Sequence, residues 1–214
     1  MSGITRLKKS GVFAFVCVCG LLSCRANGDR VVLSPEASTL PTNGFKLETI
    51  LATAQNCQNL SWIQVSSASS IELEFNRFDL KGDNKTRNSF NVQYPMLSDL
   101  GAFPAISIGV RDLFATGLER VSVYGVIGKS IPLSDRQIKL WREVKINIGA
   151  GTGWFNGVFF GIQNRFQNGI TLNMELYRYR PNISLGVPLV RNLQAKAVSL
   201  SGELYFGLSY TFAR

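Results

Sequence analysis

Apolar side chains recur at every second position along most of this sequence, and this alternation limits the folds that the chain can adopt. The clearest case is Ile170–Leu176, where Thr171, Asn173 and Glu175 separate the apolar residues. The C-terminal run Leu204–Phe212 repeats the pattern with aromatic residues. Side chains of a β-strand point alternately to opposite faces, whereas a helix repeats every 3.6 residues. The alternation therefore predicts strands that each have one apolar and one polar face.

Turn signals divide the alternating runs at the spacing of one strand plus one turn. Examples are Lys81–Asn84, Ser134-Asp135 and Gln167–Gly169. We count about ten to twelve strands, several of them near the ~9–11 residues that a tilted membrane strand requires. No segment after the N-terminus holds the ~18 apolar residues of a membrane helix. The sequence predicts an all-β fold, an antiparallel up-and-down β-barrel.

Two further features favour a membrane barrel over a soluble β-sandwich or a lipocalin-like barrel, which also alternate. The polar face is rich in Gly, Ser, Asn and Thr, as expected of a barrel interior. Aromatic residues gather toward the predicted strand ends, where interfacial girdles lie in outer-membrane barrels. These residues are Trp141, Trp154, Phe155, Tyr177, Tyr179, Tyr210 and Phe212. The soluble alternatives remain open at this point.

The N-terminus has the pattern of an export signal. Residues 1–24 combine three basic residues with an apolar run that is too short to stay in a bilayer. The run ends in Leu21-Leu22-Ser23-Cys24, which looks like a bacterial lipobox with Cys24 as the acylated residue. Ordinary cleavage after Ala26 is the alternative. We expect residues 25–43 to form a flexible tether, rich in turn signals, and residues 44–214 to form the barrel domain.

Composition excludes several classes of function. The net charge is +9, and the basic residues after residue 9 are scattered, so a nucleic-acid-binding surface is not expected. The chain has no His, which excludes Ser-His-Asp systems and His-ligated metal sites. Only Cys57 lies beyond the signal, so neither a disulfide framework nor a thiolate metal site is expected. We predict no cofactor and no enzymatic activity.

Charged residues on the polar face are the candidate site. Five charged residues occupy the alternate strand positions that are expected to face the lumen: Arg111, Lys145, Arg165, Glu175 and Glu203. Charges in a low-dielectric lumen must pair or contact water. They therefore form either structural ion pairs that fill a narrow barrel, or a polar path for an anionic saccharide. Glu175 lies between apolar neighbours on the clearest strand and is the best test position.

Two stretches of the sequence resemble a known family. The first combines Asn91–Tyr94, Phe103–Asp112, Thr116-Gly117 and Glu119, and continues with Tyr124 and Lys129. The second includes Asn168–Leu172 and Asn182–Gly186. Together they resemble the YjbH family of bacterial outer-membrane proteins, which are associated with exopolysaccharide production. The resemblance covers roughly residues 88–212. Its turn residues map to Gly109, Asp112, Gly117 and Glu119.

The resemblance implies a non-enzymatic barrel of the bacterial outer membrane that assists exopolysaccharide export or assembly. Its expected partners are outer-membrane lipid, anionic polysaccharide and envelope export proteins. Two alternatives stay open on the residues alone. One is a structural or small-solute outer-membrane barrel, and the other is a soluble periplasmic protein that binds lipid or sugar.

Overall fold

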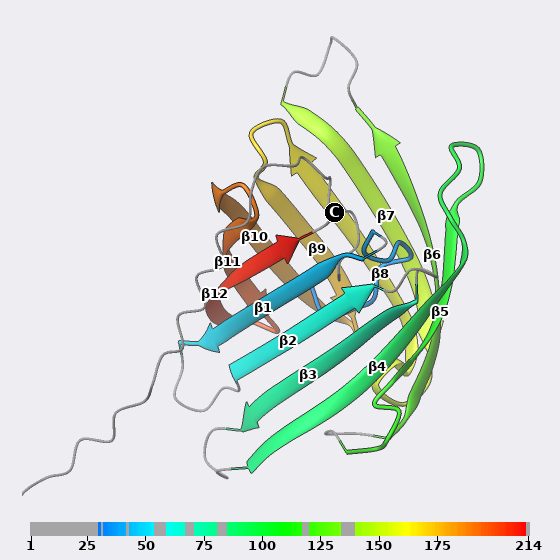
Figure 1. The fold of residues 1–214 in the computed structure, drawn as a ribbon, viewed down its shortest axis with the longest axis vertical. Helices are drawn as coiled ribbons and strands as arrows, with labels where there is room; N and C mark the ends of the chain where they lie inside the picture. The colour runs from blue at the N-terminus through cyan, green and yellow to red at the C-terminus, as the bar shows by residue number, and fades with distance from the viewer. Residues whose placement is uncertain are drawn as a thin grey trace, which may run out of the picture.

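Twelve antiparallel strands close into a single barrel (Figure 1). The structure, a computed structural model, describes residues 30, 32–41, 43–53, 59–66, 71–80, 85–116, 120–133 and 140–212. Each strand pairs with its neighbours in sequence, and β1 pairs with β12 to close the ring. The strands are β1 Phe45–Ala52, β2 Asn59–Ser66, β3 Glu72–Leu80, β4 Lys85–Leu97, β5 Ala105–Arg111, β6 Ser122–Pro132, β7 Trp141–Gly151, β8 Gly157–Phe166, β9 Thr171–Tyr177, β10 Arg180–Val190, β11 Leu193–Leu200 and β12 Glu203–Phe212.

This topology confirms the predicted all-β, antiparallel up-and-down barrel, with twelve strands. Residues 44–61 lack a period that decides between strand and helix, and their described part forms β1 and the start of β2. The predicted signal at residues 1–24, including Cys24, lies outside the described residues. No helix among the described residues is long and apolar enough to cross a bilayer.

The two ends of the barrel can be told apart by the chain termini. Phe45 at the start of β1 pairs with Phe212 at the end of β12, so the barrel begins and ends at the same rim. We call this rim the proximal end and the opposite rim the distal end. The distal end carries the two-residue turns Arg178-Tyr179 and Ser201-Gly202, together with η1, a short 3-10 helix at Gly153–Phe155.

The two faces of the wall have opposite polarity. Exposed apolar residues lie on the outer face of nearly every strand, among them Leu47, Ile63, Phe75, Ile108, Val123, Ile148, Met174, Leu185 and Phe206. Buried residues on the inner face are mostly polar, among them Gln64, Glu74, Asn76, Asn91, Ser107, Asn147, Asn173, Ser184 and Ser209. A soluble monomer rarely exposes an apolar surface of this extent, whereas a membrane barrel requires it.

Glycines opposite aromatic residues let rings lie flat against the inner wall. Gly109 on β5 is the cross-strand neighbour of Tyr124 on β6, and Gly149 on β7 is that of Phe159 on β8. A Cβ at Gly109 would lie 2.3 Å from Tyr124 Cζ, and one at Gly149 would lie 2.1 Å from Phe159 Cζ. The absence of a side chain at both positions therefore creates the space that the rings occupy.

The predicted interfacial girdle is wrong for part of the distal end. Phe155 and Tyr177 are buried inside the barrel, where Phe155 packs against Tyr124 and Phe159. The reason is that η1 folds inward and contacts β6 and β7. Tyr179, at the β9–β10 turn, is 96% exposed. Phe155 and Tyr177 therefore pack inside the distal end of the barrel instead of facing lipid.

Candidate functional site

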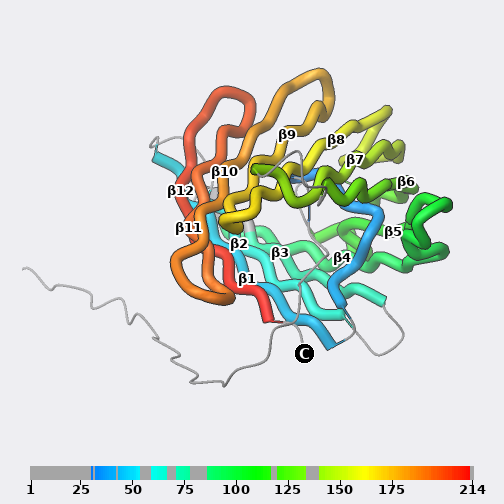
Figure 2. Tube along the Cα trace, turned by 90° about the horizontal axis from the view of Figure 1, so that it is seen from above, coloured from blue at the N-terminus to red at the C-terminus, as the bar shows by residue number. Residues whose placement is uncertain are grey.

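A segment that precedes β1 fills the lumen. It consists of residue 30 and residues 32–41, which we call the plug segment, and it lies among the strands in Figure 2. Its side chains at Arg30, Val32, Ser34, Glu36, Ala37 and Leu40 are buried. The predicted flexible tether over residues 25–43 is therefore wrong for these residues. The physical reason is that polar groups of the inner wall find their hydrogen-bond partners on this segment.

Glu175 on β9 makes the densest set of contacts with the plug segment. Its Oε2 accepts the backbone N–H groups of Val32, Leu33 and Ser34 at 3.1, 3.0 and 2.8 Å, and the Ser34 hydroxyl at 2.6 Å. Its Oε1 accepts the side-chain amide of Asn182 at 2.7 Å. Three consecutive N–H groups that converge on one oxygen form an anion-binding concavity. Both oxygens of Glu175 are thus occupied, and the carboxylate holds the bend at 32–34.

The middle of the plug segment is held from strands β4, β5 and β7. The Lys145 ammonium donates to the Glu36 carboxylate and, at 3.0 Å, to Ser38 Oγ. The main chain of Ala37 is fixed on both sides, since Asn147 Oδ1 accepts its N–H at 3.0 Å and the Ser107 hydroxyl donates to its carbonyl. The Glu36 carbonyl accepts the Gln93 amide at 2.7 Å.

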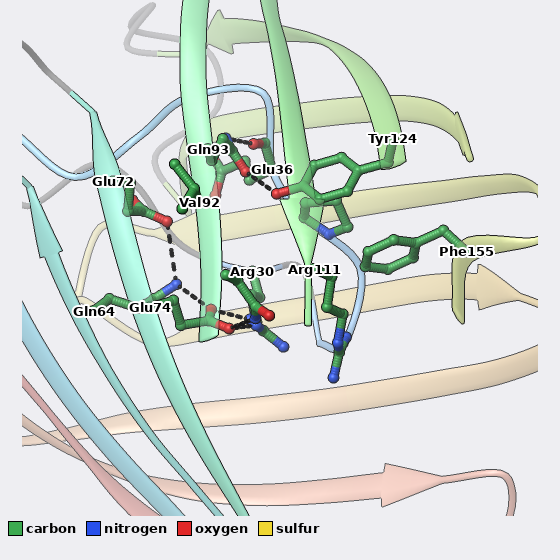
Figure 3. A pocket seen from close by; sticks show the side chains of 12 residues that line it. Arg30, Glu36, Gln64, Glu72, Glu74, Val92, Gln93, Arg111, Tyr124 and Phe155 are labelled. Carbon is green, nitrogen blue, oxygen red and sulfur yellow. Dashed lines mark hydrogen bonds and ion pairs between the residues drawn. The ribbon is translucent and has the colours of Figure 1, made fainter. Parts of the chain in front are cut away.

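The two ends of the plug segment meet carboxylates on β3. Arg30 Nε donates to Glu74 Oε2 at 2.6 Å, and the same guanidinium lies 5.6 Å from the Trp62 ring. Glu74 also accepts the Gln64 amide (Figure 3). It accepts the Asn91 amide as well. Toward the proximal end, Glu72 Oε2 accepts the Leu40 N–H at 2.8 Å. Together with the Glu175 contacts on β9, these bonds attach the segment to opposite walls of the barrel.

Apolar contacts complete the fit. Val32 belongs to a buried cluster with Ile50, Trp62, Val198 and Tyr205, on the β1, β2, β11 and β12 side. Ala37 belongs to a second cluster on the β5–β9 side, which includes the aromatic residues of the distal mouth. A cavity of about 20 Å³ remains beside Gln64, Glu72 and Glu74, which is room for about one water molecule.

Three of the five charged residues that the sequence selected are buried inside the barrel. Arg111, Lys145 and Glu175 are 3%, 8% and 3% exposed. The Arg111 guanidinium stacks 4.3 Å from the Trp154 ring near the distal mouth. Lys145 and Glu175 contact the plug segment.

The other two selected residues lie at the rims. Arg165 is half-buried, with its guanidinium 3.8 Å from the Glu143 carboxylate. Glu203 is the first residue of β12 and is exposed at the distal end, so its expected lumen position is corrected. The parity of a strand residue gives its face but not its depth along the barrel, and Glu203 lies beyond the filled part.

The turn residues taken from the family resemblance have local structural roles where they are described. Gly109 receives the Tyr124 ring. Asp112 has φ 56°, its N–H donates to Asn91 Oδ1 at 2.8 Å, and its Oδ1 accepts the Thr116 N–H at 3.0 Å. Asp112 therefore caps the turn after β5. Gly117 and Glu119 lie outside the described residues.

Sequence reasoning missed a second group of buried charges. Glu48 on β1 lies between two ammonium groups, Lys46 Nζ at 2.9 Å and Lys196 Nζ at 2.6 Å. It also missed Glu72 and Glu74 on β3. Alternation with Leu73 and Phe75 is visible in the sequence and could have identified the β3 pair. For Glu48, the signal is the alternation of Lys46 and Glu48 with Leu47.

Comparisons with known proteins support the fold alone. No protein-family model matches the chain, and no curated protein matches it. The fold is similar to that of a solved structure described as "KdgM porin", with a TM-score of 0.50 and 12% sequence identity. The match covers 79% of this chain and 99% of that one. The chain therefore has a porin-like barrel fold.

Proposed function

We propose that this protein is a bacterial outer-membrane barrel that forms a gated passage for small polar solutes, with the plug segment as its gate. The outer-membrane location is supported by the apolar outer face and by the porin-like fold. Closed barrels and apolar helices are the structures that satisfy their backbone hydrogen bonds in lipid, and this chain has the former.

One observation carries the gating role, namely the polar character of the wall against which the plug segment lies. Glu175, Asn147 and Gln93 face it, together with Ser107 and Lys145. Each of these groups can exchange its bond to the plug segment for a bond to water, so departure of the segment leaves a hydrated lumen. If the wall were apolar, departure of the plug segment would expose apolar surface to water, and the free-energy cost would oppose departure.

The charges of the inner wall favour small polar solutes over a strongly charged polymer. Buried basic and acidic residues on the described strands are equal in number: Lys46, Arg111, Lys145 and Lys196 against Glu48, Glu72, Glu74 and Glu175. A lumen lined by a single sign of charge concentrates the opposite ion, and the described part of this wall has no such bias.

Assistance in exopolysaccharide export stays a prediction that rests on the sequence resemblance to the YjbH family. The balanced lumen supplies no observation in its favour. Absence of enzymatic activity also stays a prediction. In the plugged state, Glu175 has both oxygens engaged and is not positioned to act as an acid or base.

The test begins with fractionation of the expressed protein and a comparison of heated and unheated samples on a gel. We expect the protein in the outer-membrane fraction and a faster-running unheated band. The gate is then tested by conductance in planar bilayers with the double variant Ala37→Cys, Ser107→Cys, in a Cys57→Ser background. Oxidation is expected to abolish channel openings and reduction to restore them. Equal conductance in both states, or none in either, contradicts a gate formed by this segment.

A further inference from the structure

The lumen recognises the plug segment chiefly through its main chain. The wall accepts N–H groups of Val32, Leu33, Ser34, Ala37 and Leu40, and donates to carbonyls of Arg30, Glu36 and Ala37. Main-chain groups are common to all peptides, so these bonds do not depend on the identity of the bound residues. In peptide recognition such bonds provide affinity, while side-chain pockets provide specificity.

The side-chain contacts define a short pattern. A basic residue at position 30 meets Glu74, an apolar residue at position 32 enters the cluster around Trp62, and an acidic residue at position 36 meets Lys145. Between them, the bend at 32–34 brings three N–H groups onto Glu175. The site therefore selects a basic residue, an apolar residue two positions later and an acidic residue four positions after that.

We propose that the lumen is a binding site for a peptide supplied in trans, with the plug segment as its resident occupant. This inference rests on the proposed function, because the plug segment must leave before another peptide can enter. The ligand is a polypeptide segment with the basic–apolar–acidic pattern, able to bend at the residues that meet Glu175. A second copy of this chain carries such a segment in its own residues 30–36.

The connection to β1 makes exchange geometrically simple. The plug segment joins the barrel through a tight turn, in which the Gly44 N–H donates to the Pro41 carbonyl at 2.7 Å. The Gly44 carbonyl in turn accepts the Ser66 N–H at 2.9 Å, which ties the turn to the end of β2. A cut between Pro41 and Gly44 converts the plug segment into a separate peptide while every strand of the barrel stays intact.

The experiment uses the full chain with a protease recognition sequence inserted between Pro41 and Asn43. The protein is folded in detergent and then cleaved, and a fluorescent peptide with the sequence of residues 28–42 is added. We expect saturable binding by fluorescence anisotropy, with one peptide per barrel and competition by the unlabelled peptide. A scrambled peptide of the same composition is expected not to compete.

Two modified peptides test the recognition mode. N-methylation at Leu33 removes one N–H that Glu175 accepts, and we expect about tenfold weaker binding. N-methylation at Thr39, for which no contact with the wall is described, is the matched control and should change affinity by less than about threefold. Equal effects of the two methyl groups would overturn main-chain recognition by Glu175.

Parallel conductance measurements separate this inference from the proposed function. If cleavage opens the channel and the peptide does not rebind, the gate stands and the peptide site is overturned. If the cleaved plug segment stays bound and the labelled peptide does not replace it over several days, the proposal of a peptide site open in trans is also overturned. Should the insertion prevent folding, the uncut Val32→Ala protein replaces it, because this change weakens the resident plug segment and leaves the wall intact. The labelled peptide with the unchanged sequence is expected to bind this variant more than the wild-type protein. Equal binding to both overturns the proposal.

Discussion

The Ser34 N–H donates to Glu175 Oε2 at 2.8 Å across 141 positions of sequence. This bond, with the two from Val32 and Leu33, connects the segment before the first strand to the ninth strand. It joins the two parts of the protein that matter most for its proposed function, the gate and the wall.

Glu175→Gln is expected to loosen the plug segment. Asn182 Oδ1 accepts the Ser201 N–H at 2.9 Å, so the Asn182 amide NH₂ must face residue 175. The NH₂ group of a Gln at this position would therefore face another hydrogen-bond donor, either the Asn182 amide or the N–H groups of the plug segment. Loss of a buried acceptor costs about 1–3 kcal/mol, which raises the undocked population by about 5- to 150-fold. The rate of tryptic cleavage after Arg30, which is buried in the docked state, measures this population.

Glu203→Gln is the matched control for that measurement. Glu203 also occupies one of the alternate positions of its strand that face inward, but it is exposed at the distal rim. We expect its cleavage rate to equal that of the wild-type protein. A similar acceleration in both variants would mean that Glu175 has no specific role in holding the segment.

Lys145→Met is expected to destabilise the plugged barrel by about 3 kcal/mol, because it leaves the Glu36 carboxylate buried without this ammonium. The double variant Lys145→Met, Glu36→Gln should lose less, since no lone charge remains. Urea unfolding of the protein in detergent measures both. Arg165→Met removes a partly exposed pair at the rim and should cost less than about 1 kcal/mol. Equal losses for Lys145→Met and Arg165→Met would contradict the buried position of Glu36.

Gly109→Ala is expected to destabilise the barrel, because the new Cβ would meet the Tyr124 ring at 2.3 Å. Overpacking of this kind costs about 1–3 kcal/mol. Gly125→Ala, one residue from Tyr124 on the same strand, has no atom within 4 Å of its added Cβ and should be neutral. The temperature at which the fast-running gel band disappears compares the two, and an equal shift would contradict the described packing of Tyr124.

Asp99 gives a prediction about pH at the proximal end. Burial raises the pKa of this carboxyl, but the Lys129 ammonium and the Ser130 N–H outweigh that effect and hold the pKa below its ordinary value. A lowered pKa in the folded state contributes stability above the unfolded pKa of about 3.9, and this contribution is lost as pH falls through the folded pKa.

The comparison of the wild-type protein with Asp99→Asn measures this contribution. The wild-type protein should have the higher unfolding temperature at pH 6, and the difference should shrink at pH 3. A difference that is constant between these pH values would mean that Asp99 is not linked to folding through its charge.

Local alternation was sufficient to predict the barrel wall. In β9 and β12 the period of two gave both the strand and its two faces, and the inward parity of Glu175 followed from its neighbours. These properties depend on residues that are adjacent in sequence. The depth of a residue along the barrel axis cannot be predicted in this way. Glu203 alternates in step with the buried residues of its strand, but its depth depends on how all twelve strands are aligned.

The plug segment could not be predicted from the sequence. Residues 30–41 have no alternation, and Ser34-Pro35 and Pro41 are typical of a loop. What places them inside is a set of partners on six strands, such as Glu74, Gln93 and Glu175, none of which is local. Because main-chain atoms make most of the described bonds, the side chains that mark the docked state are few, namely Arg30, Val32 and Glu36.

The most direct test of the account asks whether residue 37 lies against the inner face of β5. Ala37→Cys is combined with Ser107→Cys, whose hydroxyl donates to the Ala37 carbonyl, or with Ile108→Cys, the next residue, which is 46% exposed on the outer face. Both pairs are oxidised in isolated outer membranes in a Cys57→Ser background, and disulfide-linked peptides are measured by mass spectrometry. We predict a disulfide for 37–107 and none for 37–108. Its absence from the first pair, or equal yields in both, would contradict a lumen closed by this segment.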